Sequence, residues 1–170
     1  MLMQIHALHL LANRRSIFPI QPLSKRPLIS WKKFQDRLPD REEVIEWYTR
    51  WPDAGIAVAL GPVSGIVVVD VDSVAAEQVL IDLLGDRPQT RKAYSGSLQP
   101  GKVHYYFRDP EFETAARYTP LHPQLELRGY GGCVVLPPSL HPSGNRYRWE
   151  NHRTPICELP PALAEVWEAN

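Results

Sequence analysis

Short apolar runs bounded by glycine or proline recur along this chain and predict a series of β-strands. The clearest are residues 55–60 and 65–72, which are rich in β-branched side chains and meet at the turn sequence GPVSG. Strand pairs with short turns outnumber strand–helix alternations, so we expect an α+β fold with largely antiparallel sheets. Further strands are expected at residues 92–95, 102–107, 125–128, 133–136 and 146–149.

Three segments have the pattern of helices. Residues 2–13 form the first, and a second follows Asp40, which can cap it together with Glu43 in the capping-box position. The third begins after Ser73, its expected N-cap, and ends at Gly85. A proline-punctuated extended segment, residues 18–31, separates the first two. The second helix carries an apolar stripe at i, i+3, i+4 and i+7 that we assign to core packing: Val44, Trp47, Tyr48 and Trp51.

Two aspartates stand at the end of the strand at residues 65–72. Because side chains alternate along a strand, Asp70 and Asp72 project from one face and Val71 from the other. Two carboxylates that close repel each other unless a cation or proton lies between them. A hard divalent cation such as Mg²⁺ or Mn²⁺ takes carboxylate ligands of this kind. The alternative is a strand that simply runs out into solvent, with Asp72 favourably placed at the start of the next helix.

Two more strands carry polar pairs at the same i, i+2 spacing. Lys102 and His104 share one face of their strand, and Glu126 and Arg128 share one face of theirs. Carboxylates suit a metal, whereas lysine, histidine and arginine suit a triphosphate. Each pair alone is also what an exposed strand face contains. The coincidence of three such pairs is what favours a shared site.

A proline-stiffened loop follows the strand at residues 133–136 and carries Ser139 and His141. Its position in the chain, directly after the strand that follows Glu126, brings it within reach of the same site. Both residues are therefore weaker candidates for nucleotide contacts, and the alternative is that they are ordinary surface residues.

Length and charge limit the possible partners. The chain has 170 residues, which suits a single domain spanning residues 1–170, and its formal net charge is zero. The overall field therefore gives no reason to expect nucleic acid or a membrane surface, and any polyanion site must be local. The basic clusters are most simply solvated surface: Arg14-Arg15, Lys25-Arg26, Lys32-Lys33 and Arg146/Arg148.

Cysteine usage and the N-terminus bear on the compartment. Cys133 and Cys157 form no C-x-x-C motif, so we expect no zinc. Two buried thiols are the simplest interpretation, and a disulfide stays open. The first residues lack the features of a secretory signal, and no apolar stretch approaches the roughly 20 residues of a membrane span. We therefore expect a soluble, cytoplasmic protein without a membrane partner.

The order of these motifs resembles the N-terminal domain of bifunctional DNA primase–polymerases, in the archaeo-eukaryotic primase superfamily of plasmid and phage replication proteins. The resemblance runs from Phe18 to Trp149, most of the chain. It rests on four stretches in order: FPIQPLSKRPLISWKKF, WPDAGIAVALGPVSGIVVVDVDS, GKVHYYF and LELRGYGGCVVLPPSLHPSGNRYRW.

The resemblance implies a role for each matching residue. Asp70 and Asp72 match the acidic pair that binds catalytic divalent metals, and His104 matches a histidine that contacts the phosphates of the incoming nucleotide. Glu126 falls at the third acidic metal ligand, with Arg128 where an arginine often follows. The implied fold is an RRM-type antiparallel sheet packed with a second small α/β unit around a central cleft.

Two positions depart from the family pattern. The third acid is usually aspartate, so Glu126 lengthens that ligand by one methylene. The second motif usually has serine or glycine where Lys102 stands; the lysine either adds a phosphate contact or competes with metal for the acids.

The resemblance also implies a reaction and partners. It predicts two-metal nucleotidyl transfer from NTPs or dNTPs on a single-stranded DNA template, with Mg²⁺ or Mn²⁺ as cofactor. Lys25 and Arg26 are further candidates for template or triphosphate contacts, or an ordinary turn. Because the net charge is zero, stand-alone DNA binding is expected to be weak. A helicase or other DNA-binding region, in a longer protein or a complex, is expected to provide most of the affinity for DNA.

Two rival functions remain. The run VVVDVDSV also approximates the strand-end D-x-D of haloacid-dehalogenase-type phosphatases, in which the first aspartate is the nucleophile. That fold needs alternating strands and helices and a later acidic pair, which the second half of the chain does not offer. The other rival is a catalytically silent primase-like module that binds DNA or a partner.

Overall fold

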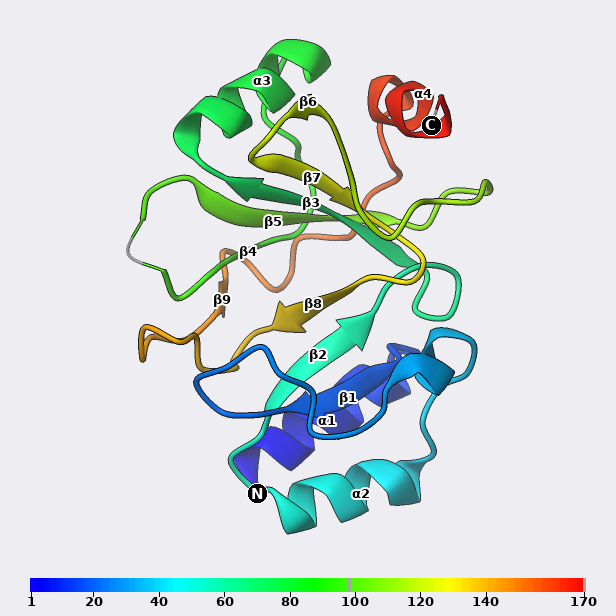
Figure 1. Ribbon diagram of the computed structural model, residues 1–170, viewed down its shortest axis with the longest axis vertical. Helices are drawn as coiled ribbons and strands as arrows, with labels where there is room; N and C mark the ends of the chain where they lie inside the picture. Colours follow the sequence, from blue (N-terminus) through cyan, green and yellow to red (C-terminus); the bar gives the residue numbers. More distant parts are fainter. Residues whose placement is uncertain (98, 170) are drawn as a thin grey trace.

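A computed structural model of the chain describes residues 1–97 and 99–169, and within them two antiparallel sheets form the centre of the molecule (Figure 1). The larger sheet has six strands in the order β6-β7-β3-β5-β4-β9. Its strands are β3 (Ile66–Asp72), β4 (Lys92–Tyr94), β5 (Lys102–Arg108), β6 (Tyr118–His122), β7 (Leu125–Arg128) and β9 (Arg148–Trp149).

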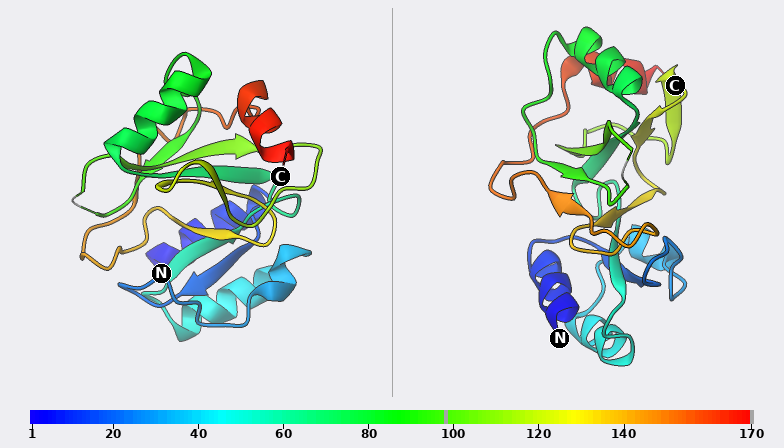
Figure 2. Two further views of the ribbon diagram at one scale, coloured as in Figure 1. Left: turned by 45° about the horizontal axis from the view of Figure 1, so that its top comes forward. Right: turned by 90° about the vertical axis from the view of Figure 1, so that its left-hand side faces the viewer.

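The smaller sheet has three strands in the order β1-β2-β8, also antiparallel. Helices α1 (Leu2–Ala12) and α2 (Arg41–Arg50) lie on its side of the molecule, and α3 (Val74–Leu84) and α4 (Pro161–Glu168) lie beyond the larger sheet (Figures 1 and 2). A short 3₁₀ helix, Lys32–Gln35, precedes α2. The strands of the smaller sheet are β1 (Ile17–Ile20), β2 (Gly55–Ala59) and β8 (Cys133–Leu136).

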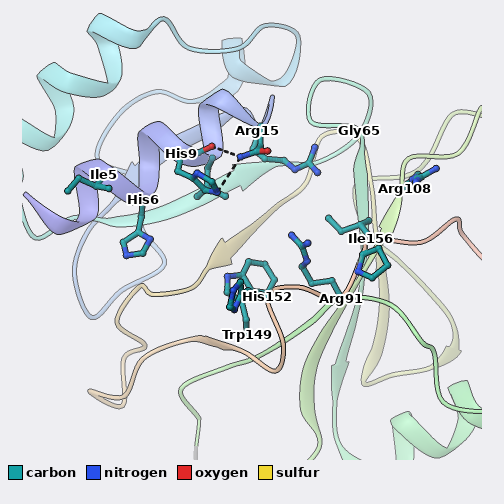
Figure 3. Close-up of a pocket in the computed structure, with 13 residues that line it drawn as sticks. Ile5, His6, His9, Arg15, Gly65, Arg91, Arg108, Trp149, His152 and Ile156 are labelled. Carbon is teal, nitrogen blue, oxygen red and sulfur yellow. Dashed lines mark hydrogen bonds between the residues drawn. The ribbon is translucent and has the colours of Figure 1, made fainter.

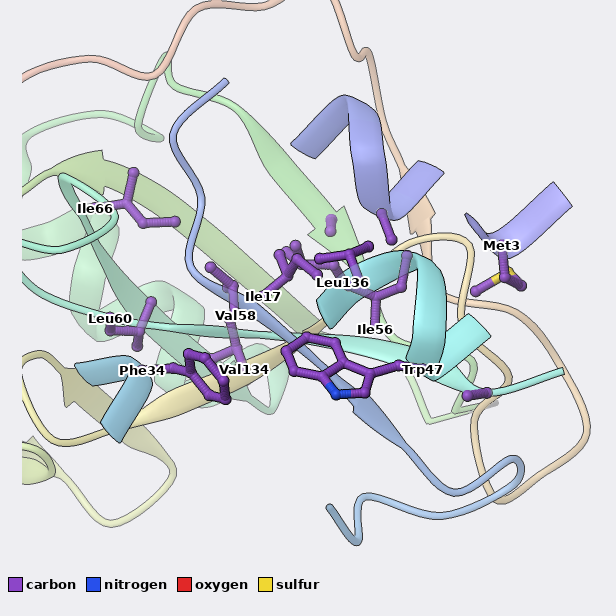
Figure 4. Close-up of a cluster of buried hydrophobic side chains, with 14 of the residues drawn as sticks. Met3, Ile17, Phe34, Trp47, Ile56, Val58, Leu60, Ile66, Val134 and Leu136 are labelled. Atoms are coloured by element: carbon purple, nitrogen blue, oxygen red, sulfur yellow. The ribbon is translucent and has the colours of Figure 1, made fainter. Parts of the chain in front are cut away.

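The two faces of β3 are buried against different partners. Val67, Val69 and Val71 belong to a core shared with α3 and α4. Ile66 and Val68 project from the opposite face, into a second core that contains residues of the smaller sheet and of α2 (Figure 4). A strand covered on both faces is expected to be an almost continuous apolar run, as this one is. Asp70 and Asp72 continue the row of Ile66 and Val68, so they emerge where this second core ends.

The second core also accounts for the predicted stripe of α2. Val44, Trp47 and Tyr48 are buried in it, and the Phe34 ring meets Trp47 edge-to-face with centroids 5.3 Å apart. The stripe therefore packs the helix, as expected. At the N-terminus of the helix, the Asp40 backbone N–H donates to Glu43 Oε2 at 2.9 Å, one half of the predicted capping box.

Helix α3 begins immediately after Asp72 because Ser73 caps it. The Ser73 hydroxyl accepts from the Ala76 N–H at 3.1 Å, and the helix ends at Gly85 in the left-handed conformation, with φ of 81°. The cap thus fixes the direction in which the chain leaves the aspartate pair.

Two glycine-rich segments carry the chain between the sheets. Residues 61–65 connect β2 to β3, and residues 129–132 connect β7 to β8. The two connections touch, since Leu60 N–H donates to the Gly132 carbonyl at 3.0 Å, and a Cβ on Gly61 would lie 3.0 Å from Tyr130. The smaller sheet is therefore held to the larger one at this end of β3.

The predicted mixed fold with antiparallel sheets is confirmed, and most strands lie within a residue or two of their expected ends. The strand expected at 146–149 is shorter, Arg148–Trp149. Strands β1 and β6 and helix α4 were not predicted as such, because a proline in each obscures the periodicity. Both neighbours of β3 are antiparallel, which excludes the parallel α/β sheet of the phosphatase alternative.

The cysteines depart from expectation in one respect. Both are free, but Cys133 and Cys157 are only partly buried, because each lies near the margin of its sheet. Burial nevertheless raises the pKa of the Cys133 thiol. As for membranes, no helix in the described part of the chain has both the length and the apolar character needed to span one.

Candidate active site

The three polar pairs predicted from the sequence form one patch on the larger sheet. Strand β3 lies between β5 and β7, and Asp70 is directly opposite His104 on one side and Glu126 on the other. Residues directly opposite across a ladder project from the same face. In the same way Asp72 is opposite Lys102, and Val68 is opposite Arg128. We call these six polar side chains the acid row: Asp70, Asp72, Lys102, His104, Glu126 and Arg128.

Asp70 is the centre of the acid row and is contacted by two basic side chains. His104 Nε2 lies 3.2 Å from Asp70 Oδ1, and Arg128 Nη1 donates to Oδ2 at 3.2 Å. The Asp70 side chain is only 13% exposed. Burial opposes its ionisation, but the charges of His104, Arg128 and Lys25 outweigh burial and hold the pKa of Asp70 below its usual range. Asp70 is therefore a carboxylate at physiological pH.

Asp72 is more exposed and pairs with a different cation. Lys102 Nζ lies 3.2 Å from Asp72 Oδ1, with the Asp72 side chain 47% exposed. Gly101, just before Lys102, packs against the start of α3, and a Cβ there would lie 2.3 Å from the Val74 nitrogen. The close approach of these two backbone segments sets the position of the Asp72–Lys102 pair.

Glu126 is held by an arginine that the sequence did not reveal. Arg117 forms a bidentate pair with it, in which Nε contacts Oε1 and Nη2 donates to Oε2 at 3.0 Å. Arg128 Nε lies 3.9 Å from the same carboxylate. Arg117 comes next to Glu126 because β6 and β7 form a hairpin. Only a prediction of β6 could have indicated this partner.

Polar atoms without partners remain beneath the acid row. His104 Nδ1, Arg128 Nε and the Tyr106 hydroxyl are buried and have no hydrogen-bond partner among the described residues. A buried polar group left unpaired costs free energy, and functional sites are where such groups occur. The acid row therefore lies over polar atoms whose hydrogen-bonding capacity no described protein group satisfies.

Tyr147, another residue that the sequence did not single out, joins His104 to His141. Its buried ring lies 6.4 Å from the His104 ring and 5.6 Å from the His141 ring, centroid to centroid. Burial, followed by the negative charge of Asp70, raises the pKa of Tyr147 to about 12. Tyr147 is thus a neutral aromatic wall between the acid row and the proline-stiffened loop.

His141 and Lys25 complete the surroundings of the acid row. Burial and the charges of Lys25 and Lys102 lower the pKa of His141. The charge of Lys25 thus acts on both His141 and Asp70, although Lys25 is an exposed residue of the turn between Gln21 and Arg26. Lys25 was expected either to contact template or triphosphate or to belong to an ordinary turn. It does lie in a turn, but one close enough to the acid row for its charge to act there.

Ser139 does not face the acid row. Its side chain is fully buried, and its hydroxyl accepts from the Ile56 N–H at 2.8 Å and donates to the Ile56 carbonyl at 3.3 Å. These bonds fasten the proline-stiffened loop to β2. The single O–H donor is used and the side chain is buried, so we do not retain Ser139 as a contact residue.

The family model of the bifunctional DNA primase/polymerase N-terminal domain matches residues 7–162. The chain belongs to this family. A search of curated proteins found no significant match. Membership indicates a nucleotidyltransferase function of the primase or polymerase type.

The three carboxylates of the acid row are the side chains of this primase/polymerase domain whose fit to a metal ion can be judged from their surroundings. Among residues 1–97 and 99–169, no three or more His, Cys, Asp or Glu side chains lie close enough together to hold a metal ion as they stand. Each acid is instead neutralised by a basic side chain. The Arg117–Glu126 and Lys102–Asp72 pairs each have one exposed partner, Arg117 at 71% and Asp72 at 47%. An exposed ion pair contributes only about 0–1 kcal/mol, so these two pairs can be exchanged for a divalent cation, and the oxygen donors fit a hard ion. Asp70 is different, because His104 and Arg128 contact it in a largely buried position.

The six acid-row side chains line neither of two cavities found elsewhere in the described part of the chain. One is between α1 and the far end of the larger sheet (Figure 3), and the other is lined by residues 109–114 with Tyr130. Neither cavity wall carries carboxylates next to basic side chains on one sheet face, as the acid row does.

Proposed function

We propose that this domain catalyses template-directed nucleotidyl transfer, adding NTPs or dNTPs to a 3′-hydroxyl on single-stranded DNA and thereby making and extending primers. The observation that carries the proposal is the register of three strands, which sets Asp70 opposite both His104 and Glu126. Carboxylates and basic side chains thus lie together on one surface. The family match supports the same class of reaction.

Asp70, Asp72 and Glu126 are the residues that would hold Mg²⁺ or Mn²⁺. A pair of such ions, when bound, increases the acidity of the attacking hydroxyl and neutralises charge on the leaving pyrophosphate. Asp70 suits this task because its low pKa keeps it ionised. In this proposal Lys102 and Arg117 release Asp72 and Glu126 to the metal.

The basic residues of the row bind the triphosphate. In the reaction the 3′-hydroxyl oxygen bonds to the α-phosphorus, and the bond from that phosphorus to the bridging oxygen breaks to release pyrophosphate. Lys102, His104 and Arg128 neutralise the phosphate oxygens, which is a major electrostatic contribution in such reactions. Asp70 orients His104 through Nε2, and Tyr147 shields one side of the imidazole from water. In this proposal His141 contacts the nucleotide, and Lys25 contacts the triphosphate or the template.

The finer fold assignment belongs to the same proposal. The larger sheet corresponds to the RRM-type sheet of archaeo-eukaryotic primases, and the smaller sheet with α1 and α2 corresponds to the second α/β unit, with the nucleotide cleft between them. We further propose that the domain works beside a helicase or another DNA-binding region of a replication protein.

A catalytically silent primase-like module is the second candidate, and one observation favours it. Arg117, Lys102 and Arg128 already neutralise all three acids. In a silent module these ion pairs are permanent, and the surface serves only to bind DNA or a partner.

Primer synthesis on single-stranded DNA tests the proposal. The protein is incubated with template, labelled NTPs or dNTPs, and Mg²⁺ or Mn²⁺, and products are resolved on a gel. Asp70→Asn and Asp72→Asn should each reduce product by about two orders of magnitude or more, because each removes a charged ligand from the transition state. The matched control is Asp53→Asn, an exposed aspartate before β2, which should retain full activity.

The alternatives give different results. No product from the unsubstituted protein with either metal, together with retained DNA binding, would establish the silent module. Release of phosphate from monoesters without strand growth would point to hydrolysis instead. Equal activity in Asp70→Asn and Asp53→Asn would refute a catalytic role for the acid row.

A further inference from the structure

A large cavity lies at the opposite end of β3 from the acid row (Figure 3). Its volume is about 1010 Å³, and its walls come from α1, the segment after it, and the chain around β9. Figure 2 shows α1 and the region of β9 on the same side of the molecule. Gly65, just before β3, forms part of the wall. Gly65 lies five positions, or about 17 Å, from Asp70 along the chain, whereas Trp149 in another part of the wall is level with His104, because Ala93 of β4 pairs with both. None of the six acid-row side chains is among the residues that line the cavity.

Three arginines line this cavity. Arg15 follows α1, Arg91 precedes β4, and Arg108 ends β5. Figure 3 shows Arg15 and Arg91 extending toward the cavity from opposite walls. None of the 13 lining residues drawn there is acidic. The arginine at the rim, Arg108, has one acidic partner, Glu158, with Nη1 and Oε1 2.5 Å apart.

The two inner arginines are fixed by the backbone rather than by carboxylates. Arg15 Nη1 donates to the Ser64 carbonyl at 2.6 Å, and Arg91 Nε donates to the Thr154 carbonyl at 2.8 Å. A guanidinium has five N–H donors, so each keeps several for a ligand. Burial lowers the pKa of both side chains, and the neighbouring charge of Arg91 lowers that of Arg15 further. Arg15 and Arg91 repel each other, and no carboxylate of the lining residues lies between them to offset the repulsion. A bound anion would offset it.

Planar rings accompany these cations. Trp149 lines the cavity; its ring meets Tyr106 edge-to-face at a centroid distance of 5.1 Å, and the Arg91 guanidinium lies over the ring, 5.9 Å from its centroid. His6, His9 and His152 are also in the wall. A rigid tryptophan beside fixed guanidinium groups is the combination that binds single-stranded nucleic acid, in which bases stack and phosphates pair with cations.

We propose that this cavity is an accessory groove for single-stranded nucleic acid, in which Arg15, Arg91 and Arg108 contact successive phosphates and a base stacks against Trp149. A peptide with acidic side chains would use the arginines but not the ring. The groove requires neither metal nor nucleotide, so it is independent of the proposed chemistry. A net charge of zero argues against binding of a polyanion by the protein as a whole, but a local cluster of positive charge can still bind one.

Binding of a fluorescent oligodeoxythymidylate, followed by anisotropy in EDTA, tests the groove. The variant is Arg91→Gln/Arg108→Gln, and the matched control is Arg41→Gln/Arg50→Gln, which removes two exposed arginines of α2 and gives the same net charge. We expect Kd to rise about tenfold or more in the variant. The slope of log K against log salt should fall by about 1.4, at about 0.7 per lost phosphate contact with a single strand. The control should change Kd less than twofold.

A second variant guards against misfolding. His9 is exposed on α1, so His9→Glu adds a negative charge to the wall without touching the core. It too should weaken binding, with an unchanged thermal midpoint. Asp70→Asn, which affects the proposed chemistry, should bind the oligonucleotide at least as well as the unsubstituted protein. Failure of catalysis and failure of the groove are thus separable.

Cross-linking locates the strand. Oligonucleotides with 5-iodouracil should attach to Trp149 or His152, as identified by mass spectrometry of the digested protein. Equal loss of binding in the two double variants, or cross-links confined to Tyr147 and His141 beside the acid row, would overturn the proposal.

Discussion

Asp70 lies directly opposite Glu126 across the ladder between β3 and β7, and the two carboxylates share one face of the sheet. Like charges placed opposite each other across strands are destabilising unless they are compensated. Here Arg128 contacts the first carboxylate and Arg117 the second. The two arginines thus offset the repulsion between these carboxylates, and a bound metal ion could do the same in their place.

Removing Arg117 tests that replacement. Arg117→Ala frees Glu126, so we expect the Mn²⁺ concentration needed for half-maximal primer synthesis to fall about two- to fivefold, in line with the ~0–1 kcal/mol that an exposed ion pair contributes. Titration of activity with Mn²⁺ measures this. Arg148→Ala, which removes an exposed arginine lying over Tyr94, is the control and should leave the titration unchanged. A higher metal requirement in Arg117→Ala would show that the arginine supports the site instead.

Gly101 is expected to be intolerant of a side chain. Its φ is +79°, and a Cβ would lie 2.3 Å from the Val74 nitrogen, so Gly101→Ala strains the backbone and pushes the start of α3 away from Lys102. We expect a loss of at least about 1 kcal/mol in the free energy of unfolding, with reduced activity. Gly85→Ala is the matched control, since its φ is +81° but a Cβ there meets no atom within 4 Å. Equal losses by urea denaturation would mean that the contact with α3 is unimportant.

Glu43 gives α2 a pH-dependent cap. The hydrogen bond from Arg37 lowers the pKa of Glu43 to about 2, with the Asp40 N–H adding to the effect, against an ordinary value of 4.5. Because the folded pKa is the lower one, the stabilisation is complete above about pH 4.5 and is lost as the pH falls toward 2. Glu43→Gln should therefore cost about 1 kcal/mol at pH 7 and almost nothing near pH 2.

Thermal unfolding across this pH range measures the difference between Glu43→Gln and the unsubstituted protein. Glu42→Gln, one residue earlier in the same exposed first turn, is the control and should show a smaller difference at pH 7. A Glu43→Gln deficit that persists unchanged near pH 2 would contradict the assignment.

Ser139 is expected to matter for stability and not for nucleotide binding. Ser139→Ala leaves the buried Ile56 N–H without its partner, so we expect the free energy of unfolding to fall by about 1–3 kcal/mol. Urea denaturation measures this, with the exposed Ser143→Ala as control. The apparent KM for nucleotide should stay within twofold in Ser139→Ala; a large increase would return Ser139 to the nucleotide site.

Local rules of the chain determined a definite part of this protein. The two-residue period of a strand put Asp70 and Asp72 on one face, and likewise Lys102 with His104 and Glu126 with Arg128. The cap at Ser73 and the buried stripe of α2 could likewise be predicted from the sequence, because each depends only on residues within about two helical turns of one another. The order of these motifs also carried the family resemblance.

Tertiary structure alone decided which strands are neighbours. The meeting of Asp70 with His104 and Glu126, the pairing of Arg117, the burial of Ser139 and the cavity beside Trp149 all join segments that are far apart or unpredicted in sequence. Pairing and register between distant strands are selected by the packing of whole sheet faces into shared cores. The sequence pattern of a single strand contains no information about its partner.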